Sequence, residues 1–306
     1  MIGRQTSKRV VERALRLLLG NPARSAGRSL ILAYHNVVPD GLPAQGDQSL
    51  HLPLGSFMGQ LDLLASYCRV LPLAELLADG PATDRPSVAI TFDDAYRGAT
   101  ELAMPELASR GLPSTLFVAP GLLGRRALWW DELADRETGL APALRAEALG
   151  PAEGRHDEVQ RRFPQAGRAA SLPEWYGCAD EPTVRGLWNS GSVTLGAHSW
   201  SHPNLTRVAP EALADELRRP LEWLRASDAP TLPLLAYPYG LCTPLVEQAA
   251  RKAGYTAALL VDGGWLGAGG NRFRVPRFNV PAGLSDDGFM LRLSGILGIS
   301  SPATGR

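Results

Sequence analysis

The stretch RPSVAITFDDAY at residues 85–96 joins an apolar run to two adjacent carboxylates. Residues 85–92 are short and almost continuously apolar, which predicts a strand that is buried on both faces. Asp93 and Asp94 follow at the carboxyl end of this strand, where parallel α/β folds build their active sites. The stretch therefore predicts both a class of fold and the position of a site.

Short apolar runs alternate with segments of helical periodicity on both sides of this stretch. This alternation is typical of a parallel sheet buried under helices, and the number of units favours a distorted (β/α) barrel. The expected strands span residues 29–34, 85–92, 114–118, 193–197, 232–237 and 256–261. The expected helices span residues 54–67, 98–109, 210–226 and 244–253.

Two segments depart from the alternation. Residues 131–181 are rich in Ala, Arg and Glu with Gly and Pro between them, and we expect a helical insertion in one barrel loop of a single domain at 29–300. Residues 1–28 form a basic extension with a predicted helix. A peripheral contact of this helix with an anionic membrane is one interpretation. We favour the other, a solvated helix packed on the domain.

The composition excludes several classes of protein. Lys+Arg and Asp+Glu both number 31, and no basic cluster is interleaved with aromatic residues, so nucleic acid is not an expected partner. The three cysteines lack the spacing of a disulfide framework or a thiolate metal site. No signal peptide or membrane-spanning stretch is evident, which predicts a cytoplasmic protein, and nothing indicates an oligomeric state.

A second pair of polar residues follows another predicted strand. His198 and His202 are four residues apart after the apolar run at 193–197, a spacing that suits a divalent metal ion. Read alone, this pair is an ambiguous signal, and the carboxylates at 93 and 94 could simply cap a helix. Together, Asp94, His198 and His202 offer one oxygen and two nitrogens and leave positions open for water and substrate, as catalytic sites do.

Three motifs also carry a resemblance to a known family. TFDDAY at 91–96, HSWSHPNL at 198–205 and AYPYG at 236–240 resemble, in order and form, those of the polysaccharide deacetylases, the NodB-homology or carbohydrate esterase 4 group. The resemblance runs from about residue 29 to about residue 278. It implies a distorted (β/α) barrel that hydrolyses acetyl groups on glycans.

The resemblance also implies roles for individual residues. Asp93 resembles the family's general base, and Asp94, His198 and His202 resemble its metal ligands. Tyr239 resembles the residue whose backbone N–H helps to hold the oxyanion, together with the metal. The ligand types favour Zn²⁺, although such sites also accept Co²⁺, Ni²⁺ or Mn²⁺.

Two positions depart from the family pattern, and the sequence offers a replacement for each. Ala236 stands where the family usually has an arginine, and no histidine follows His202 to supply the usual general acid. His35, after Tyr34, resembles an N-terminal Tyr-His of exopolysaccharide and poly-N-acetylglucosamine deacetylases and could protonate the leaving amine. RVPR at 274–277 resembles a late arginine-bearing segment of the same subgroup, and its Arg277 could orient Asp93 by a bidentate pair. The alternative for His35 is a histidine that is hydrogen-bonded in the core. The alternative for Arg277 is a surface or structural arginine.

The remaining candidates are aromatic residues and two further histidines. Trp129 and Trp130 open the insertion, where they either stack on a sugar, the role we assign to Trp130, or pin the insertion to the barrel. We expect His51 to be a loop residue and His156 to be solvated.

The function that follows is removal of N-acetyl groups from a polysaccharide containing N-acetylhexosamine, in exopolysaccharide biosynthesis. A glycan is then the expected partner. One alternative is deacetylation of a small or lipid-linked amino sugar, or hydrolysis of another amide on the same scaffold. Another is a catalytically decayed glycan-binding protein, and the missing C-terminal histidine is its best support.

Overall fold

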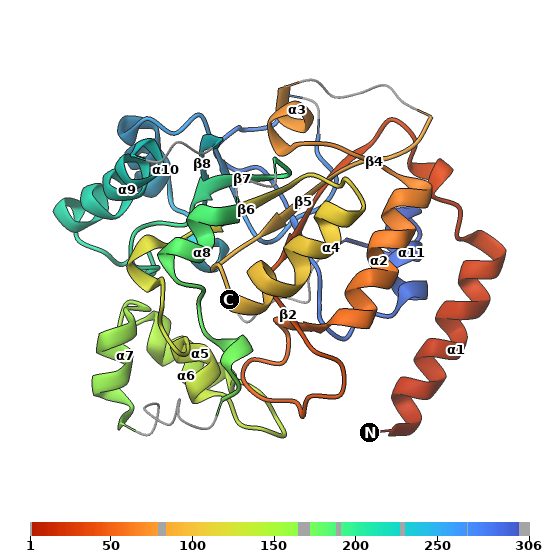
Figure 1. The fold of residues 1–306 in the computed structure, drawn as a ribbon, viewed down its shortest axis with the longest axis horizontal. Coiled ribbons are helices and arrows are strands. Elements are labelled where there is room, and N and C mark those ends of the chain that lie inside the picture. The colour runs from red at the N-terminus through yellow and green to blue at the C-terminus, as the bar shows by residue number, and fades with distance from the viewer. Residues whose placement is uncertain are drawn as a thin grey trace.

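The computed structural model of the chain describes residues 2–78, 84–164, 172–187, 191–226, 230–267 and 269–299, with side chains in the first helix from Lys8 onward. Figure 1 shows one curved sheet in the middle of the molecule with helices around it. The sheet is parallel throughout, in the order β10-β1-β5-β6-β7-β8-β9, and β4 also pairs with β5. The strands are β1 (Ser29–Tyr34), β4 (Arg69–Val70), β5 (Ser87–Phe92), β6 (Ser114–Val118), β7 (Val193–Ala197), β8 (Thr231–Ala236), β9 (Ala257–Leu259) and β10 (Phe278–Asn279).

A segment near the C-terminus closes the sheet into a barrel. Val275 exchanges backbone hydrogen bonds with β9: its N–H donates to Ala258 at 3.0 Å, and Leu260 N–H donates to its carbonyl at 2.8 Å. Three residues later the same segment, as β10, pairs with β1 in the register Leu32–Phe278. Residues 272–279, which we name the closing segment, therefore join the two edges of the sheet. The expected distorted (β/α) barrel is confirmed.

The helices that cover the barrel follow the predicted periodicity. In α2, the side chains of Phe57, Leu61 and Leu64 form one fully buried face. The predicted helix at 98–109 instead begins as a π-helical turn, η2, and continues as α4, because Pro105 has no N–H to offer the carbonyl four residues before it. These helices are α2 (Leu54–Tyr67), α3 (Leu73–Ala78), η2 (Ala99–Ala103), α4 (Met104–Ser109), η3 (Pro120–Leu122), α9 (Pro210–Arg225), η8 (Pro238–Gly240), α10 (Pro244–Ala253) and α11 (Asp286–Leu293).

In the described residues, the segment between β6 and β7 consists of short helices joined by turns, with isolated β-bridges at Asp135–Gly139 and Tyr96–Cys178. Figure 1 shows α5, α6 and α7 grouped together at one end of the molecule. Residues 165–171, which fall within the expected insertion, lie outside the described residues. The helices are α5 (Trp129–Leu133), α6 (Pro142–Leu149), α7 (His156–Arg162), η6 (Glu174–Tyr176) and α8 (Glu181–Gly186).

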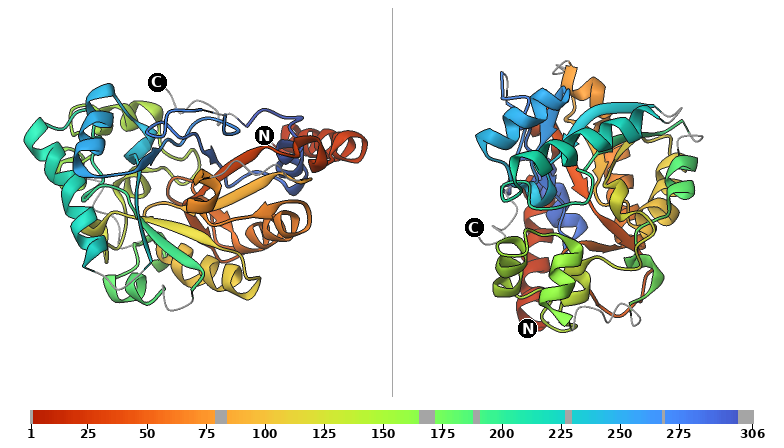
Figure 2. Two further views of the ribbon diagram at one scale, coloured as in Figure 1. Left: turned by 90° about the horizontal axis from the view of Figure 1, so that it is seen from above. Right: turned by 90° about the vertical axis from the view of Figure 1, so that its left-hand side faces the viewer.

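Two further features lie outside the barrel strands. A small parallel sheet pairs β2 (Asn36–Val38) with β3 (His51–Pro53), next to the end of β1. The N-terminal helix α1 (Ile2–Leu19) packs against α11 and is followed by η1 (Pro22–Ser25). Figure 2 shows α1 at the periphery of the molecule. None of the helices in the described ranges has the length and apolar content to cross a lipid bilayer.

Candidate active site

One pocket lies at the carboxyl ends of the barrel strands. Its walls come from residues that follow β1, β5, β7, β8 and β9, and from the insertion, so segments far apart in sequence meet there. The lining residues are His35, Asp47, Ser49, Leu50, Asp93, Asp94, Trp130, Arg145, His198, His202, Tyr237, Tyr239, Val261 and Asn279.

The backbone of the site loops is unusual. In the described ranges, six non-glycine residues have positive φ, a region that side chains with a Cβ rarely adopt. Five of the six lie in the loops after β5, β7 and β8: Asp94 (68°), Ala95 (52°), Ser199 (61°), His202 (58°) and Tyr239 (59°). Such strain persists only where the surrounding structure holds it, and it is concentrated at functional sites.

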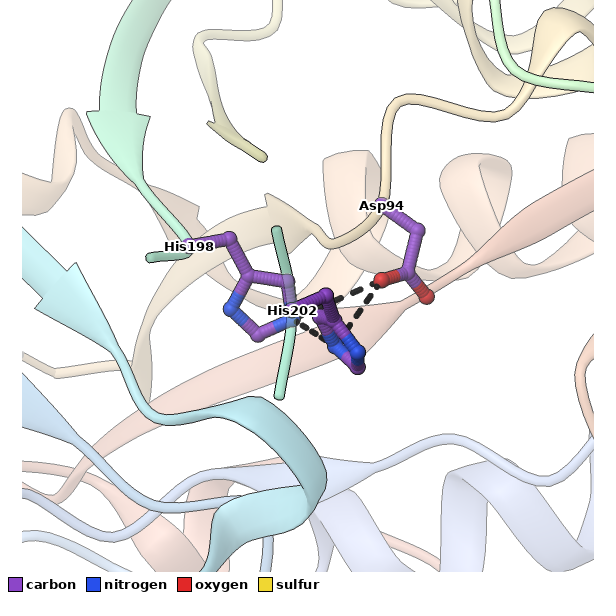
Figure 3. Close-up of side chains that lie close together, drawn as sticks. All are labelled: Asp94, His198 and His202. Carbon is purple, nitrogen blue, oxygen red and sulfur yellow. Dashed lines mark hydrogen bonds and ion pairs between the residues drawn. The ribbon is translucent and has the colours of Figure 1, made fainter. Parts of the chain in front are cut away.

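The side chains of Asp94, His198 and His202 converge on one point (Figure 3). Asp94 Oδ1 lies 3.2 Å from His202 Nε2 and 3.5 Å from His198 Nε2, and the two nitrogens are 3.0 Å apart. All three side chains are buried. His198 Nδ1 lies 2.8 Å from the carbonyl of Ala236, to which it donates, so the lone pair on Nε2 faces the centre of the cluster.

The charges of this cluster fit a cation. Among the described atoms, the buried Asp94 Oδ1 has no hydrogen-bond partner. Burial, and then the charges of Asp93 and Asp131, raise the pKa of Asp94 well above its usual value. Burial, and then His198, lower the pKa of His202 well below its usual value. A carboxylate that lacks a counter-charge beside two neutral imidazoles is the donor set of a divalent metal ion.

Asp93 has its own cationic partner. Arg277, from the closing segment, is fully buried and donates from Nη1 and Nη2 to the two carboxylate oxygens at 2.8 and 2.7 Å. Its Nε donates to the carbonyl of Leu260 at 2.7 Å. Burial alone would raise the pKa of Asp93, but Arg277 and then His198 outweigh it and hold that pKa below its usual value. Asp93 is therefore ionised at neutral pH and fixed in orientation.

His35 lies between β1 and β2 on the wall of the same pocket. Burial lowers its pKa to about 4, and the nearby charges of Asp93 and Arg277 act in opposite directions. The ring is therefore neutral at pH 7. His35 thus lies in the same pocket as Asp93 and the histidine pair.

The aromatic residues bind the insertion to the barrel. Trp129 Nε1 donates to the Tyr239 hydroxyl at 3.0 Å, and Trp130 Nε1 donates to the Tyr96 hydroxyl at 2.6 Å. The ring of Trp130 also lies 5.1 Å from that of His202, centroid to centroid. Both indoles are almost fully buried, so these contacts fit a role in pinning the insertion, and Trp130 in addition walls the pocket.

A buried network that no sequence motif predicts surrounds Asp131. Asp131 Oδ1 accepts from His51 Nε2 and from the Asp47 backbone N–H, both at 2.8 Å, and Oδ2 accepts from the Tyr96 hydroxyl at 2.7 Å. Asn36 Nδ2 lies 3.0 Å from His51 Nδ1 and donates to it, so Nε2 is the ring nitrogen that donates to Asp131. The adjacent Trp-Trp was the only sequence signal for this network.

Two expectations about histidines were wrong. His51 is not a loop residue: it begins β3 and is buried, because its Nε2 donates to the buried carboxylate of Asp131. His156 is not solvated: it begins α7 at 6% exposure, and burial lowers its pKa to about 4. The charged stretch RHDE at 155–158 concealed the burial of His156, whereas His51 lies between two leucines.

Comparison with known proteins agrees with this geometry. The sequence profile of the family described as Polysaccharide deacetylase matches residues 80–258, more than half of the chain. Three solved structures have the same fold at under 25% identity. The deacetylase PplD from Streptococcus pyogenes has TM-score 0.61 and 16% identity, with 87% of this chain and 98% of that chain covered. IcaB from Ammonifex degensii has TM-score 0.57 and 18% identity, with 88% and 96% covered.

The third is a de-N-acetylase from Aggregatibacter actinomycetemcomitans, with TM-score 0.55 and 17% identity, covering 84% of this chain and 96% of that chain. The family match spans the carboxylate pair, the histidine pair and the AYPYG motif, so the resemblance seen in the sequence is confirmed. The chain belongs to the polysaccharide deacetylase family.

Proposed function

We propose that this protein hydrolyses the N-acetyl group of N-acetylhexosamine units in an exopolysaccharide, with a divalent metal ion bound by Asp94, His198 and His202. The family assignment supports deacetylase activity. The observation that carries the proposal is the buried cluster of three metal donors beside an ionised Asp93 that Arg277 holds in place.

The donor set favours zinc. When bound, such an ion supplies a Lewis acid that polarises the acetyl carbonyl and lowers the pKa of a water molecule. The residues of the chain then have to position the water, move its proton and stabilise the charge that develops on the carbonyl oxygen.

Asp93 is the proposed general base. Its carboxylate is ionised at neutral pH and lies next to the metal donors, with one oxygen 3.9 Å from His198 Nε2. It accepts a proton from the attacking water. Arg277 keeps the carboxylate from rotating, so that the base is already aligned before substrate binds.

His35 is the proposed source of the proton for the leaving nitrogen. Because its ring is neutral at pH 7, it acts as an N–H donor and not as an imidazolium. As the carbon–nitrogen bond breaks, His35 gives a proton from one ring nitrogen to the departing amine. In the same step the proton that Asp93 took from water passes to the other ring nitrogen, so no imidazolate forms and both side chains end as they began.

Tyr239 and Trp130 complete the proposal. The backbone N–H of Tyr239, in its positive-φ turn, is the proposed donor to the oxyanion. Trp130 walls the pocket beside His202 and excludes water from that side. The Aggregatibacter neighbour is described as a de-N-acetylase, which supports nitrogen as the acylated atom. The Tyr34-His35 pair and Arg277, which resemble features of exopolysaccharide deacetylases, support a polymeric substrate.

The first prediction tests the base and the metal together. Acetate release from N-acetylated glycans should require metal, and Asp93→Asn should reduce it by at least about a thousandfold while metal content stays near normal, because the amide cannot take the proton. Asp215→Asn, an exposed carboxylate on α9, is the matched control.

The measurement is acetate release with and without chelator, together with metal analysis of each variant. Turnover by Asp93→Asn near the wild-type rate would exclude Asp93 as the base. Release from small or lipid-linked amino sugars but not from polymers would reject the exopolysaccharide assignment. Tight glycan binding without any acetate release would indicate a decayed, glycan-binding site.

A further inference from the structure

The N-terminal helix α1 exposes its apolar side chains to solvent. In the described ranges eight large apolar side chains are exposed, and five of them lie on α1. Leu17 and Leu18 are 80% and 79% exposed, and Val10 is 64% exposed. Since a helix has 3.6 residues per turn, Val10, Leu17 and Leu18 fall within one sector of the helix, with Val11 at its border. We name these four residues the α1 stripe.

Two polar side chains of α1, Glu12 and Arg16, face the domain instead. Arg16 Nη1 lies 2.7 Å from Asp287 Oδ1 at the start of α11, and the nearly buried Glu12 accepts from the Ser285 hydroxyl at 2.7 Å. This arrangement is the reverse of an ordinary surface helix, whose apolar face is buried. The helix cannot turn its stripe inward without breaking both contacts, so the outward orientation is fixed by the fold.

Basic side chains border the stripe. Arg9 and Arg13 are exposed, and they lie four residues apart on the flank of the α1 stripe. The ion pairs that α1 makes among the described side chains are Lys8–Glu12 and Arg16–Asp287, and neither uses these two arginines. The stripe is therefore a strip of aliphatic surface with unneutralised positive charge along its edge.

We propose that the α1 stripe docks the protein on a membrane surface that contains anionic lipid. The helix would lie in the plane of the headgroups, with Val10, Leu17 and Leu18 in the acyl boundary and Arg9 and Arg13 at the phosphates. A second copy of the chain would bring the same positive side chains to the rim and leave their charge unopposed. The charge of the rim therefore favours lipid over self-association.

The test is sedimentation of the full-length protein with vesicles. Phosphatidylcholine vesicles with about one third phosphatidylserine should bind the protein, and pure phosphatidylcholine vesicles should bind it far less. Arg9→Gln with Arg13→Gln should weaken binding by about thirtyfold, because each basic side chain near an anionic surface contributes roughly a fivefold factor. Leu17→Gln with Leu18→Gln should weaken it by at least about tenfold.

The matched control is Leu245→Gln with Lys252→Gln on α10, where Leu245 is 57% exposed, and it should bind vesicles like the wild type. All variants should keep the wild-type melting temperature and acetate release from a soluble substrate. Equal binding to both kinds of vesicle, or binding that the α1 variants leave unchanged, overturns the proposal. So does a dimer in sedimentation analysis that Leu17→Gln with Leu18→Gln dissociates, because the stripe is then an interface between subunits.

Discussion

Arg277 pairs with Asp93 across 184 residues of sequence, and both side chains are out of contact with solvent. A buried carboxylate that loses such a partner is left with an uncompensated charge. The pair also sets the charge state of Asp93, since the guanidinium opposes the effect of burial on its pKa. The position that the family usually gives to an arginine near the AYPYG motif is Ala236 here, and Arg277 brings the charge from the closing segment.

We predict that Arg277→Met lowers the free energy of unfolding by roughly 3–5 kcal/mol at pH 7, because it leaves the buried carboxylate of Asp93 without a positive partner. The depressed pKa of Asp93 gives stability that is present above its ordinary pKa and lost as pH falls through the lower, folded value. In the variant that pKa rises, so the acid limb of the pH–rate profile should move to higher pH. Denaturant unfolding and the pH dependence of acetate release measure the two effects.

An unchanged acid limb in Arg277→Met would contradict the assignment of Asp93 as the base that Arg277 keeps ionised. Arg274→Met is the control, because Arg274 lies in the same segment and pairs at the surface with Glu247 instead. It should cost at most about 1 kcal/mol.

His35 carries a second prediction at this scale. His35→Ala should reduce acetate release by about a hundredfold or more, the usual contribution of a positioned proton donor, and should retain the metal. His156→Ala is the control, because it removes a buried histidine that does not line the pocket. It shows whether the loss of a buried ring alone lowers acetate release, without the loss of a proton donor at the site. Normal turnover by His35→Ala would show that the proton comes from another group.

At the scale of elements, the insertion is fastened to the barrel through Asp131. Its two oxygens accept from His51 of β3, from the backbone of Asp47 and from Tyr96, which lies two residues after the proposed metal donor Asp94. The same contacts place Trp130 against His202. One carboxylate therefore connects the position of the insertion to the shape of the metal site.

Asp131→Asn should lower the free energy of unfolding by roughly 2–3 kcal/mol. The reason is that the side-chain NH₂ of asparagine would replace a carboxylate oxygen and face another hydrogen-bond donor, which leaves both without an acceptor. It should also make the insertion more susceptible to limited proteolysis. Asp157→Asn, at an exposed position of α7, is the control and should stay within about 0.5 kcal/mol of the wild type. Equal stability of Asp131→Asn and the wild type would mean that the insertion is held by its aromatic contacts alone.

The elements also show what a sequence can and cannot reveal. The ends of β1, β6 and β7 are as predicted, because each is an apolar run bounded by polar or turn residues. β2, β3 and β10 span only two or three residues, too few for any periodicity to appear. Their pairing depends on neighbours distant in sequence, and so does the network of Asp131. The metal donors, in contrast, lie within motifs of a few residues.

At the scale of the whole molecule, the proposed metal site links metal binding to folding stability. The three donors come from loops after β5 and β7, and they are held together only in the folded chain. An ion that binds the folded state stabilises it by about 2.7 kcal/mol at a concentration one hundred times its Kd. Removing the ion should return Asp94 to its raised pKa beside two neutral rings.

We therefore predict that chelator lowers the melting temperature and that added Zn²⁺ restores it. His198→Ala should abolish the response to zinc, while His156→Ala should keep it. Differential scanning calorimetry with metal analysis measures both. A melting temperature that is indifferent to chelator and zinc in the wild type would contradict a metal site at Asp94, His198 and His202.

The closing segment also has a place in the order of synthesis. During synthesis, Asp93 and the three proposed metal donors leave the ribosome before residue 272. The closing segment, which joins β9 to β1 and carries Arg277, the partner of Asp93, leaves it later. Under the proposed mechanism, a nascent chain, or one clipped before Arg272, carries the metal donors and lacks an aligned base. Hydrolysis thus begins only once the barrel is sealed, which makes catalytic activity itself a report on complete folding.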